Sequence, residues 1–164
     1  MKEEETNFRA PYERFIRGAC ETGLVWTLRD EEGYVTTDSG EYENEEGEAL
    51  VLFCFWSDEE KARACAIEGW EAYHPEAIPL GAFLEEWCVW MSDDEMLAGV
   101  EFDSSLVGNE QEPLQLVLDI AAELKRQGKE ISLAKFDHLD RFVALIDDLT
   151  RQAGDVERQE TPAV

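Results

Sequence analysis

Ala49-Leu50-Val51-Leu52-Phe53-Cys54-Phe55-Trp56 is the longest apolar run in the sequence. Its β-branched and aromatic side chains, and its lack of charge, predict a strand buried on both faces. We therefore expect residues 49–56 to form a central strand of a sheet. The run is far shorter than the roughly 20 apolar residues that a membrane-spanning helix needs.

Further strands are predicted on both sides of this run. Residues 24–28 and 34–37 are rich in β-forming side chains, and the turn residues 30–33 between them predict a hairpin. Residues 38–48 are acidic and predict a loop. Residues 96–102 predict another strand, and the segment around Tyr73, His74, Pro75 and Pro79 is expected to be irregular.

Apolar side chains recur at helical spacing in the remaining segments. The predicted helices are residues 11–21, 58–68, 79–91, 114–127 and 133–152. Ser57 with Glu60 is typical of a capping box at the second helix, and Ser132 is the expected cap of the last. Gly128 is expected to end the helix before it.

The order of these elements predicts a single α+β domain. We expect a mainly antiparallel sheet of about four strands, covered by helices, with an added C-terminal helix. Residues 1–10 are expected to be a flexible tail and residues 11–152 the domain, in which 132–152 carry the added helix. Residues 153–164 are expected to form a second flexible tail.

The balance of charge excludes several classes of protein. The chain has 39 Asp and Glu against 14 Lys and Arg in 164 residues, a formal net charge of −25. Direct nucleic-acid binding is not expected, because it requires a basic surface. Docking on anionic membranes is not expected for the same reason. The charged N-terminus lacks the apolar segment of a secretory signal, so we expect a cytoplasmic protein, either a monomer or a homodimer.

The cysteines are expected to be buried free thiols in a reducing cytosol. Their positions, Cys20, Cys54, Cys65 and Cys88, match no common zinc or redox spacing. A disulfide or a metal site remains the alternative.

No set of catalytic residues stands out. The histidines are His74, in the segment expected to be irregular, and His138, inside the last predicted helix, and no nucleophile motif accompanies either. Glycine-rich phosphate-binding loops are absent. We therefore expect no catalytic, cofactor-binding or metal-binding residues. A small enzyme or ligand binder, with a pocket near His74, Trp70 and Trp87, is kept as an alternative.

Acidic and aromatic residues are the most informative feature for function. Residues 30–48 contain many acids and no Lys or Arg, and most of the tryptophans lie between residues 56 and 90. Such side chains suit the binding of a basic protein, as in an immunity protein or a nucleic-acid mimic. The candidate partner-binding residues are Glu41, Glu43, Glu45, Glu46, Glu48, Trp56, Trp70, Tyr73, Trp87 and Trp90.

Other readings of these residues remain open. The large rings can simply build the core, and an acidic run is usually a solvated loop. The acidity of the whole chain can also be an adaptation of an accessory domain to a salty cytosol, in which charges are screened over about 3 Å at 1 M salt.

A set of short runs carries a resemblance to a known family. They are Tyr12-Glu13-Arg14-Phe15, Val25-Trp26, Glu32-Gly33, Phe55-Trp56-Ser57, Gly69-Trp70, Ile78-Pro79-Leu80, Phe83 with Trp87, Leu97-Ala98-Gly99-Val100 and Glu112-Pro113-Leu114. Over about residues 11–120 the chain resembles the small bacterial proteins of the domain of unknown function 2750 family. The resemblance implies a shared fold, and it implies no catalytic residues. The long acidic segment 38–48 and the helix 133–152 are expected departures from the family.

Overall fold

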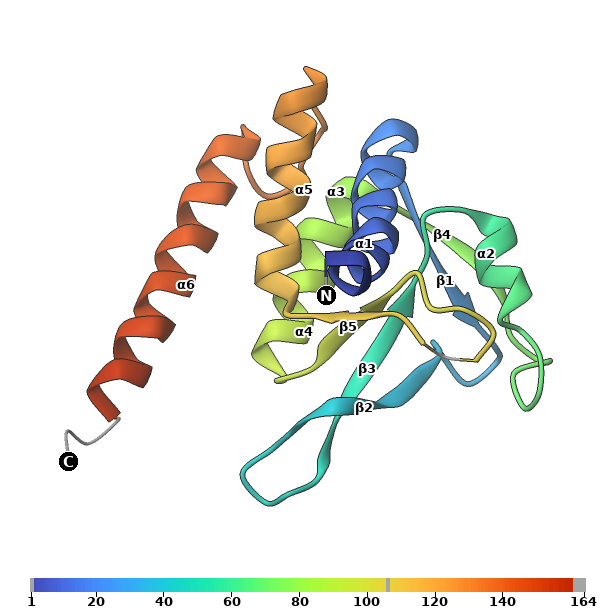
Figure 1. The fold of residues 1–164 in the computed structure, drawn as a ribbon. Helices are drawn as coiled ribbons and strands as arrows, with labels where there is room; N and C mark the ends of the chain where they lie inside the picture. Colours follow the sequence, from blue (N-terminus) through green and yellow to red (C-terminus); the bar gives the residue numbers. More distant parts are fainter. Residues whose placement is uncertain (1, 106, 161–164) are drawn as a thin grey trace.

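The computed structural model describes the backbone of residues 2–105 and 107–160, and the side chains of residues 10–105 and 107–152. Most of its helices lie on one side of a twisted sheet, whereas the helix at residues 59–64 packs on the other side (Figure 1). The sheets contain β1 (Leu24–Arg29), β2 (Thr36–Glu43), β3 (Ala49–Phe55), β4 (His74–Pro79), β5 (Leu97–Val100) and β6 (Asn109–Gln111). The helices are α1 (Lys2–Thr22), α2 (Glu59–Ala64), α3 (Leu80–Ala82), the π-helical turn η1 (Phe83–Cys88), α4 (Val89–Asp93), α5 (Pro113–Gln127) and α6 (Leu139–Glu160). The expected α+β class is confirmed.

Strand β3 is central, as predicted. It pairs antiparallel with β2 and parallel with β5 in a four-stranded sheet of order β2-β3-β5-β6. Phe53 and Phe55 belong to one core cluster, whereas Leu52, Cys54 and Trp56 belong to the other. The strand therefore buries both of its faces, which is why its sequence shows no polar alternation.

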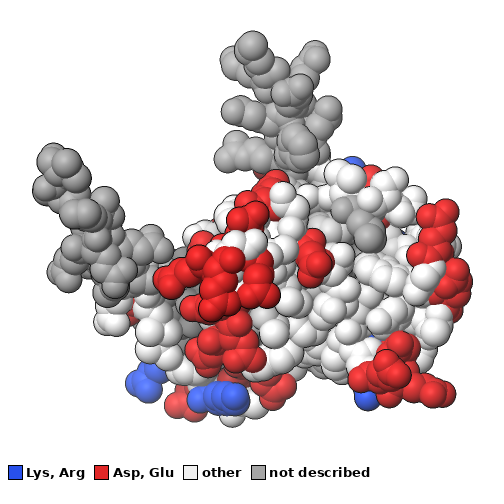
Figure 2. All heavy atoms as spheres, turned by 90° about the horizontal axis from the view of Figure 1, so that it is seen from below, with Lys and Arg blue, Asp and Glu red and all other residues white. Residues whose placement is uncertain are grey.

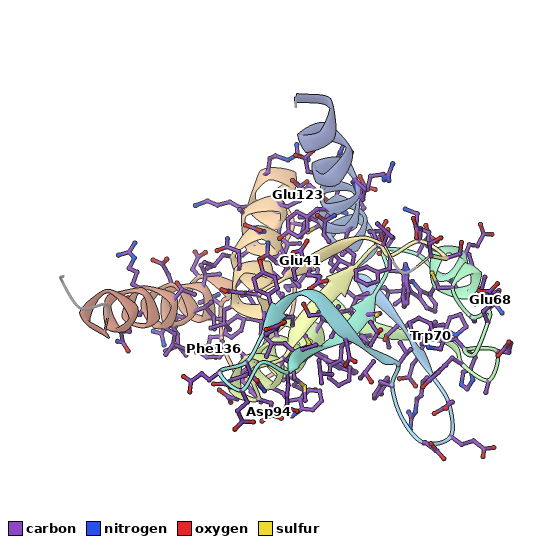
Figure 3. All side chains as sticks on the ribbon, turned by 60° about the horizontal axis from the view of Figure 1, so that its bottom comes forward. Glu41, Glu68, Trp70, Asp94, Glu123 and Phe136 are labelled. Atoms are coloured by element: carbon purple, nitrogen blue, oxygen red, sulfur yellow. The ribbon has the colours of Figure 1, made fainter. Side chains whose placement is uncertain are left out.

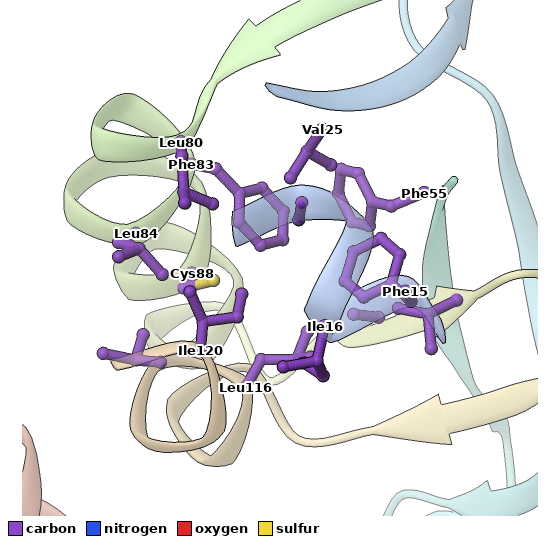
Figure 4. Packing of buried hydrophobic residues seen from close by; sticks show 14 of the residues in the cluster. Phe15, Ile16, Val25, Phe55, Leu80, Phe83, Leu84, Cys88, Leu116 and Ile120 are labelled. Atoms are coloured by element: carbon purple, nitrogen blue, oxygen red, sulfur yellow. The ribbon is translucent and has the colours of Figure 1, made fainter. Parts of the chain in front are cut away.

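The larger core lies between β3 and the helices. The ring of Phe83 lies 4.9 Å from the ring of Phe55 and 6.5 Å from that of Phe15, measured between centroids. Leu116 and Ile120 of α5 close the same cluster (Figure 4). Burial of such side chains stabilises the fold by about 1.5–3 kcal/mol each.

Strand β1 does not form the predicted hairpin with residues 34–37. It pairs along its length with β4, with Val25 opposite Ile78, and only an isolated bridge joins Arg29 to Tyr34. The segment around Tyr73, His74, Pro75 and Pro79, which the sequence predicts to be irregular, therefore contains strand β4 instead. An edge strand can accommodate Pro75 and Pro79. A proline has no amide N–H, and on the outer side of an edge strand no other strand needs that donor.

The acidic loop predicted for residues 38–48 is confirmed only at residues 44–48. Residues up to Glu43 continue as β2, and residues 44–48 form the turn into β3. The acids of β2 point into solvent, so this strand gives no apolar alternation that a sequence pattern would detect.

Helix boundaries also differ from the predictions. Helix α1 begins at Lys2 rather than at residue 11 and contains Pro11. The cap of α2 is Asp58, whose carboxylate accepts the amide of Lys61 at 2.8 Å, and not Ser57. The last helix begins at Leu139 rather than at residue 133, and Ser132 does not cap it. Gly128 ends α5 with a left-handed φ of 68°, as expected.

No described helix is both long and apolar enough to cross a membrane.

Candidate functional site

The β2–β3 hairpin carries the predicted acidic side chains on its far end. Glu41, Glu43, Glu45, Glu46 and Glu48 are all exposed. Tyr42 lies among them and is 46% exposed. Among the side chains that the structure describes, none forms an ion pair with these glutamates. Figure 2 shows Asp and Glu side chains gathered on the face of the molecule at this end.

The turn of the hairpin is held by a side chain. The Asn44 side-chain oxygen accepts the amides of Glu46 at 2.9 Å and of Glu48 at 3.0 Å. Gly47 adopts a φ of 82° there, a conformation that favours glycine. The acids at the tip therefore sit on a defined turn.

A second set of hydrogen bonds fixes the hairpin where it leaves the sheet. The pairing of β2 with β3 shifts register between Asp38 and Glu43, as at a β-bulge. The Ser39 hydroxyl accepts the amides of Glu41 at 3.0 Å and Tyr42 at 2.8 Å, and it donates to Glu110 of β6. The other Glu110 oxygen accepts the amide of Gly40 at 3.0 Å. The hairpin is thus fixed at both ends.

Among the candidate aromatic residues, Trp90 is the most exposed. It is 43% exposed, and its ring centroid lies 5.1 Å from that of Phe53 on β3. Trp87 lies 6.2 Å away and is half-buried against the larger core. The labelled Asp94, just beyond α4, lies at the same end of the molecule as the hairpin (Figures 1 and 3).

The remaining aromatic candidates lie elsewhere. Trp56 is fully buried, and its indole N–H donates to the Phe102 carbonyl at 2.9 Å, so its predicted place on a partner surface is wrong. Trp70 and Tyr73 pack against each other, at 6.1 Å, on the second core cluster. The candidate residues therefore form no single surface. The alternation of Leu52, Cys54 and Trp56 on one face of β3 is the pattern that could have revealed the burial of Trp56.

The predicted pocket near His74 is not formed by the residues expected to build it. His74 is exposed on β4 opposite Arg29. Trp70 and Trp87 belong to different core clusters, and no contact described in the structure joins His74 to either indole.

A cavity that the sequence did not indicate opens at the carboxyl ends of the parallel strands β3 and β5. Its volume is about 470 Å³. Helix α1 contributes Arg14, helix α2 contributes Lys61 and Ala64, and the segment after β5 contributes Glu101 and Val107. Ligands in sheets with parallel strands commonly bind outside these strand ends.

Glu101 is the organising residue of this cavity. Its side chain is 3% exposed, and one carboxylate oxygen accepts the Lys61 ammonium at 2.8 Å. The other oxygen accepts the Ser57 amide at 2.6 Å. Its φ of 54° is left-handed, a conformation that non-glycine residues rarely adopt. Residue 101 is too far in sequence from residues 57 and 61 for any spacing rule to connect them.

The cysteines are free and buried, as expected. Burial raises the pKa of the Cys20 and Cys54 thiols to about 12, so neither forms a nucleophilic thiolate near neutral pH. Across the described residues, no group of three or more His, Cys, Asp or Glu side chains could hold a metal ion.

The family comparison supports the resemblance seen in the sequence. A family model described as Protein of unknown function (DUF2750) matches residues 12–120. Neither the curated proteins nor the solved structures that were compared with the chain gave a match. The matched region contains the hairpin and almost the whole lining of the cavity, and it ends within α5, before α6.

Proposed function

The chain belongs to the DUF2750 family, proteins of unknown function, and from this starting point we propose that it is a non-enzymatic, cytoplasmic binding module for a basic protein. One observation carries the proposal: the β2–β3 hairpin presents exposed glutamates around an exposed tyrosine on a backbone that Asn44 and Ser39 fix at both ends. Trp90, which packs against Phe53 on the second strand of the hairpin, adds exposed aromatic surface.

Electrostatics supports a basic partner. A net charge of −25 creates a negative potential that attracts a basic protein and speeds its association. The fixed hairpin lowers the entropy cost of binding, because the acids are already held in place. The partners that fit are proteins with a basic cleft, such as a toxin or a protein that otherwise binds nucleic acid.

A second candidate is an accessory domain whose acidity suits a salty cytosol. The observation in its favour is that acids also cover surfaces away from the hairpin (Figure 2). On this reading no partner occupies the hairpin, and the charges keep the surface hydrated at high salt.

Two variants of equal net charge distinguish the candidates. The hairpin variant carries Glu→Gln at positions 41, 43, 45, 46 and 48. The control neutralises the same number of exposed acids elsewhere, by Glu21→Gln, Glu68→Gln, Glu130→Gln, Asp137→Asn and Asp148→Asn. Each protein is used to capture partners from its native lysate at about 0.1 M and about 0.5 M salt, where charges are screened over roughly 10 Å and less than half that distance.

The captured protein is then purified and its association rate is measured by surface plasmon resonance. We expect a basic partner that binds at the lower salt, with association at least about tenfold slower for the hairpin variant than for the control. Equal slowing in both variants would show that total charge, and not the hairpin, governs binding. Capture of no protein at either salt would favour the accessory domain.

A further inference from the structure

We infer that the cavity at the carboxyl ends of β3 and β5 binds a small organic anion that carries an apolar body. This inference concerns a different part of the molecule from the hairpin, and it stands whether or not a protein partner binds there. The cavity, at about 470 Å³, is large enough for a ligand of this kind.

The charge of the ligand follows from which groups of the cavity already have partners. Glu101 accepts the Lys61 ammonium and the Ser57 amide. Asp103, the other carboxylate of the lining, accepts the amides of Ser105 at 2.9 Å and Val107 at 3.1 Å. Glu101 therefore already has a cation as its partner, and Asp103 has two hydrogen-bond donors on one of its oxygens.

Arg14 is the group without a partner. Arg14 of α1 lines the cavity and is exposed, and no hydrogen bond or ion pair joins its guanidinium to any side chain or backbone group that the structure describes. A guanidinium binds carboxylates and phosphates through paired hydrogen bonds. In a chain with a net charge of −25, a cation left unpaired beside a cavity points to an anionic ligand.

The residues that line the cavity indicate that the ligand has an apolar part. Pro11, Ala64, Phe102 and Val107 line the cavity, and its surface is mostly apolar. The Phe102 carbonyl accepts both the Trp56 indole N–H, at 2.9 Å, and the Cys65 thiol, at 3.2 Å. These bonds hold the wall in a fixed position before any ligand arrives.

The left-handed backbone of Glu101 supports the same conclusion. Such a conformation at a non-glycine residue costs of order 1–3 kcal/mol and is found preferentially at functional sites. Here it turns the chain between β5 and the cavity wall while it aims the carboxylate at Lys61. The salt bridge pairs the Lys61 ammonium with Glu101 and leaves Arg14 to meet the anion.

The test uses a matched set of small probes and amide NMR. The probes are 3-phenylpropanoate, phenyl phosphate, neutral 3-phenylpropanol and cationic 3-phenylpropylamine, each titrated into the labelled full chain. We expect the anions to shift the amide signals of Ala64, Gly108 and Asn109 with a Kd on the order of 1 mM or tighter. The alcohol should bind at least about fivefold more weakly, and the amine more weakly still. Tighter binding of phenyl phosphate than of the carboxylate would assign the natural anion to the phosphates, and the reverse order to the carboxylates.

Variants locate the site. Arg14→Gln should weaken binding of the anions by about tenfold and leave binding of the alcohol unchanged. Arg17→Gln is the matched control, because Arg17 is exposed on the same helix and lies outside the cavity. Ala64→Phe, at an exposed position of the lining, should block all the probes by filling the space. Equal binding of the alcohol and the anions, or an Arg14→Gln variant that binds like the wild type, would overturn the inference.

Discussion

Glu85 shows how one buried side chain positions a distant segment. It lies in the π-helical turn η1, is 4% exposed, and its carboxylate accepts the backbone amides of both Ala134 and Lys135. Single π-helical turns often mark functional or strained positions. Here the turn aims a carboxylate at the segment between α5 and α6 and fixes the backbone of residues 134 and 135.

Replacement of this carboxylate should therefore loosen the segment. We expect Glu85→Ala to lower the free energy of unfolding by about 1–3 kcal/mol, since two backbone amides lose the buried carboxylate that accepts them. Glu86→Ala, at an exposed neighbouring position, should change it by no more than about 0.5 kcal/mol. Urea denaturation measures both values. Faster hydrogen exchange at Ala134 and Lys135 in the Glu85 variant alone would confirm the local cause, and equal effects of the two variants would contradict it.

Glu123 provides a test of pH dependence. Hydrogen bonds from Arg126 and Gln127 lower its pKa to about 2. This lies below the value of about 4.3 in an unfolded chain. The interaction therefore stabilises the fold fully above pH 4.3, and its contribution is lost as the pH falls toward 2.

Removal of the Arg126 guanidinium should raise the pKa of Glu123. We expect Arg126→Gln to bring the pKa of Glu123 closer to its ordinary value, whereas Lys125→Gln, at an exposed neighbouring position, should leave it low. Carbon-detected NMR titration of the Glu123 carboxyl measures the change. An unchanged pKa in the Arg126 variant would show that a group other than Arg126 lowers the pKa of Glu123.

Single residues were predictable where local pattern decides their surroundings. Gly128 and the buried cysteines behave as their sequence context indicates. Trp56 and Trp90 have similar acidic neighbours in sequence, yet one is fully buried and the other is 43% exposed. Only the packing of separate elements decides between them. The pairing of Lys61 with Glu101 depends on the meeting of α2 with the end of β5, which no local pattern encodes.

At the scale of elements, α6 packs against the rest of the protein along only part of its apolar stripe. Phe142 and Ile146 are buried, whereas Leu145 and Leu149 are 45% and 42% exposed. The ring of Phe142 lies 5.0 Å from that of Phe136, in the segment that leads into the helix. The apolar stripe predicted for this helix is thus only partly covered by its own chain.

Replacing a side chain by alanine should lower the free energy of unfolding more on the buried side of α6 than on its exposed side. We expect Phe142→Ala to lower the free energy of unfolding by about 3–5 kcal/mol, because it leaves a cavity against α5. Leu145→Ala should cost less than about 1 kcal/mol, since that side chain is already half in water. Urea denaturation of the two variants provides the comparison, and similar costs would show that Leu145 is covered in solution.

Elements with strong apolar periodicity were predicted well. Strand β3 and helix α5 begin and end within one residue of their expected bounds. Strand β4 was missed because prolines normally argue against a strand, and β2 because its exposed acids hide the alternation. Both are edge strands, whose sequences are less constrained by burial.

At the scale of the whole molecule, self-repulsion should limit stability. A net charge of −25 favours expanded states when salt is low. We expect the melting temperature to rise as NaCl increases from about 0.1 M to about 1 M, where the screening length falls from roughly 10 Å to 3 Å. The hairpin variant should show a smaller rise than the wild type. Scanning calorimetry measures both, and a melting temperature independent of salt would mean that the acids lie too far apart to repel.

The class of the fold was predictable from the order of elements, but their arrangement was not. Pairing of β1 with β4, and of β3 with β5, joins segments separated by long stretches of chain. The sequence shows which segments are strands more readily than which strands become neighbours. For the same reason the cavity between α1, α2 and the end of β5 could not be predicted from the sequence.

The acids that flank β3 have a consequence for the chain before it folds. Residues 49–55 form an apolar segment without Pro or Gly, a type of sequence that readily stacks into cross-β aggregates. Glu43, Glu45, Glu46 and Glu48 precede it, and Asp58, Glu59 and Glu60 follow it. Like charges on both sides keep copies of the segment apart, as gatekeeper residues do. We therefore expect these flanking acids to keep the newly made chain from aggregating until β2 and β5 cover its central strand.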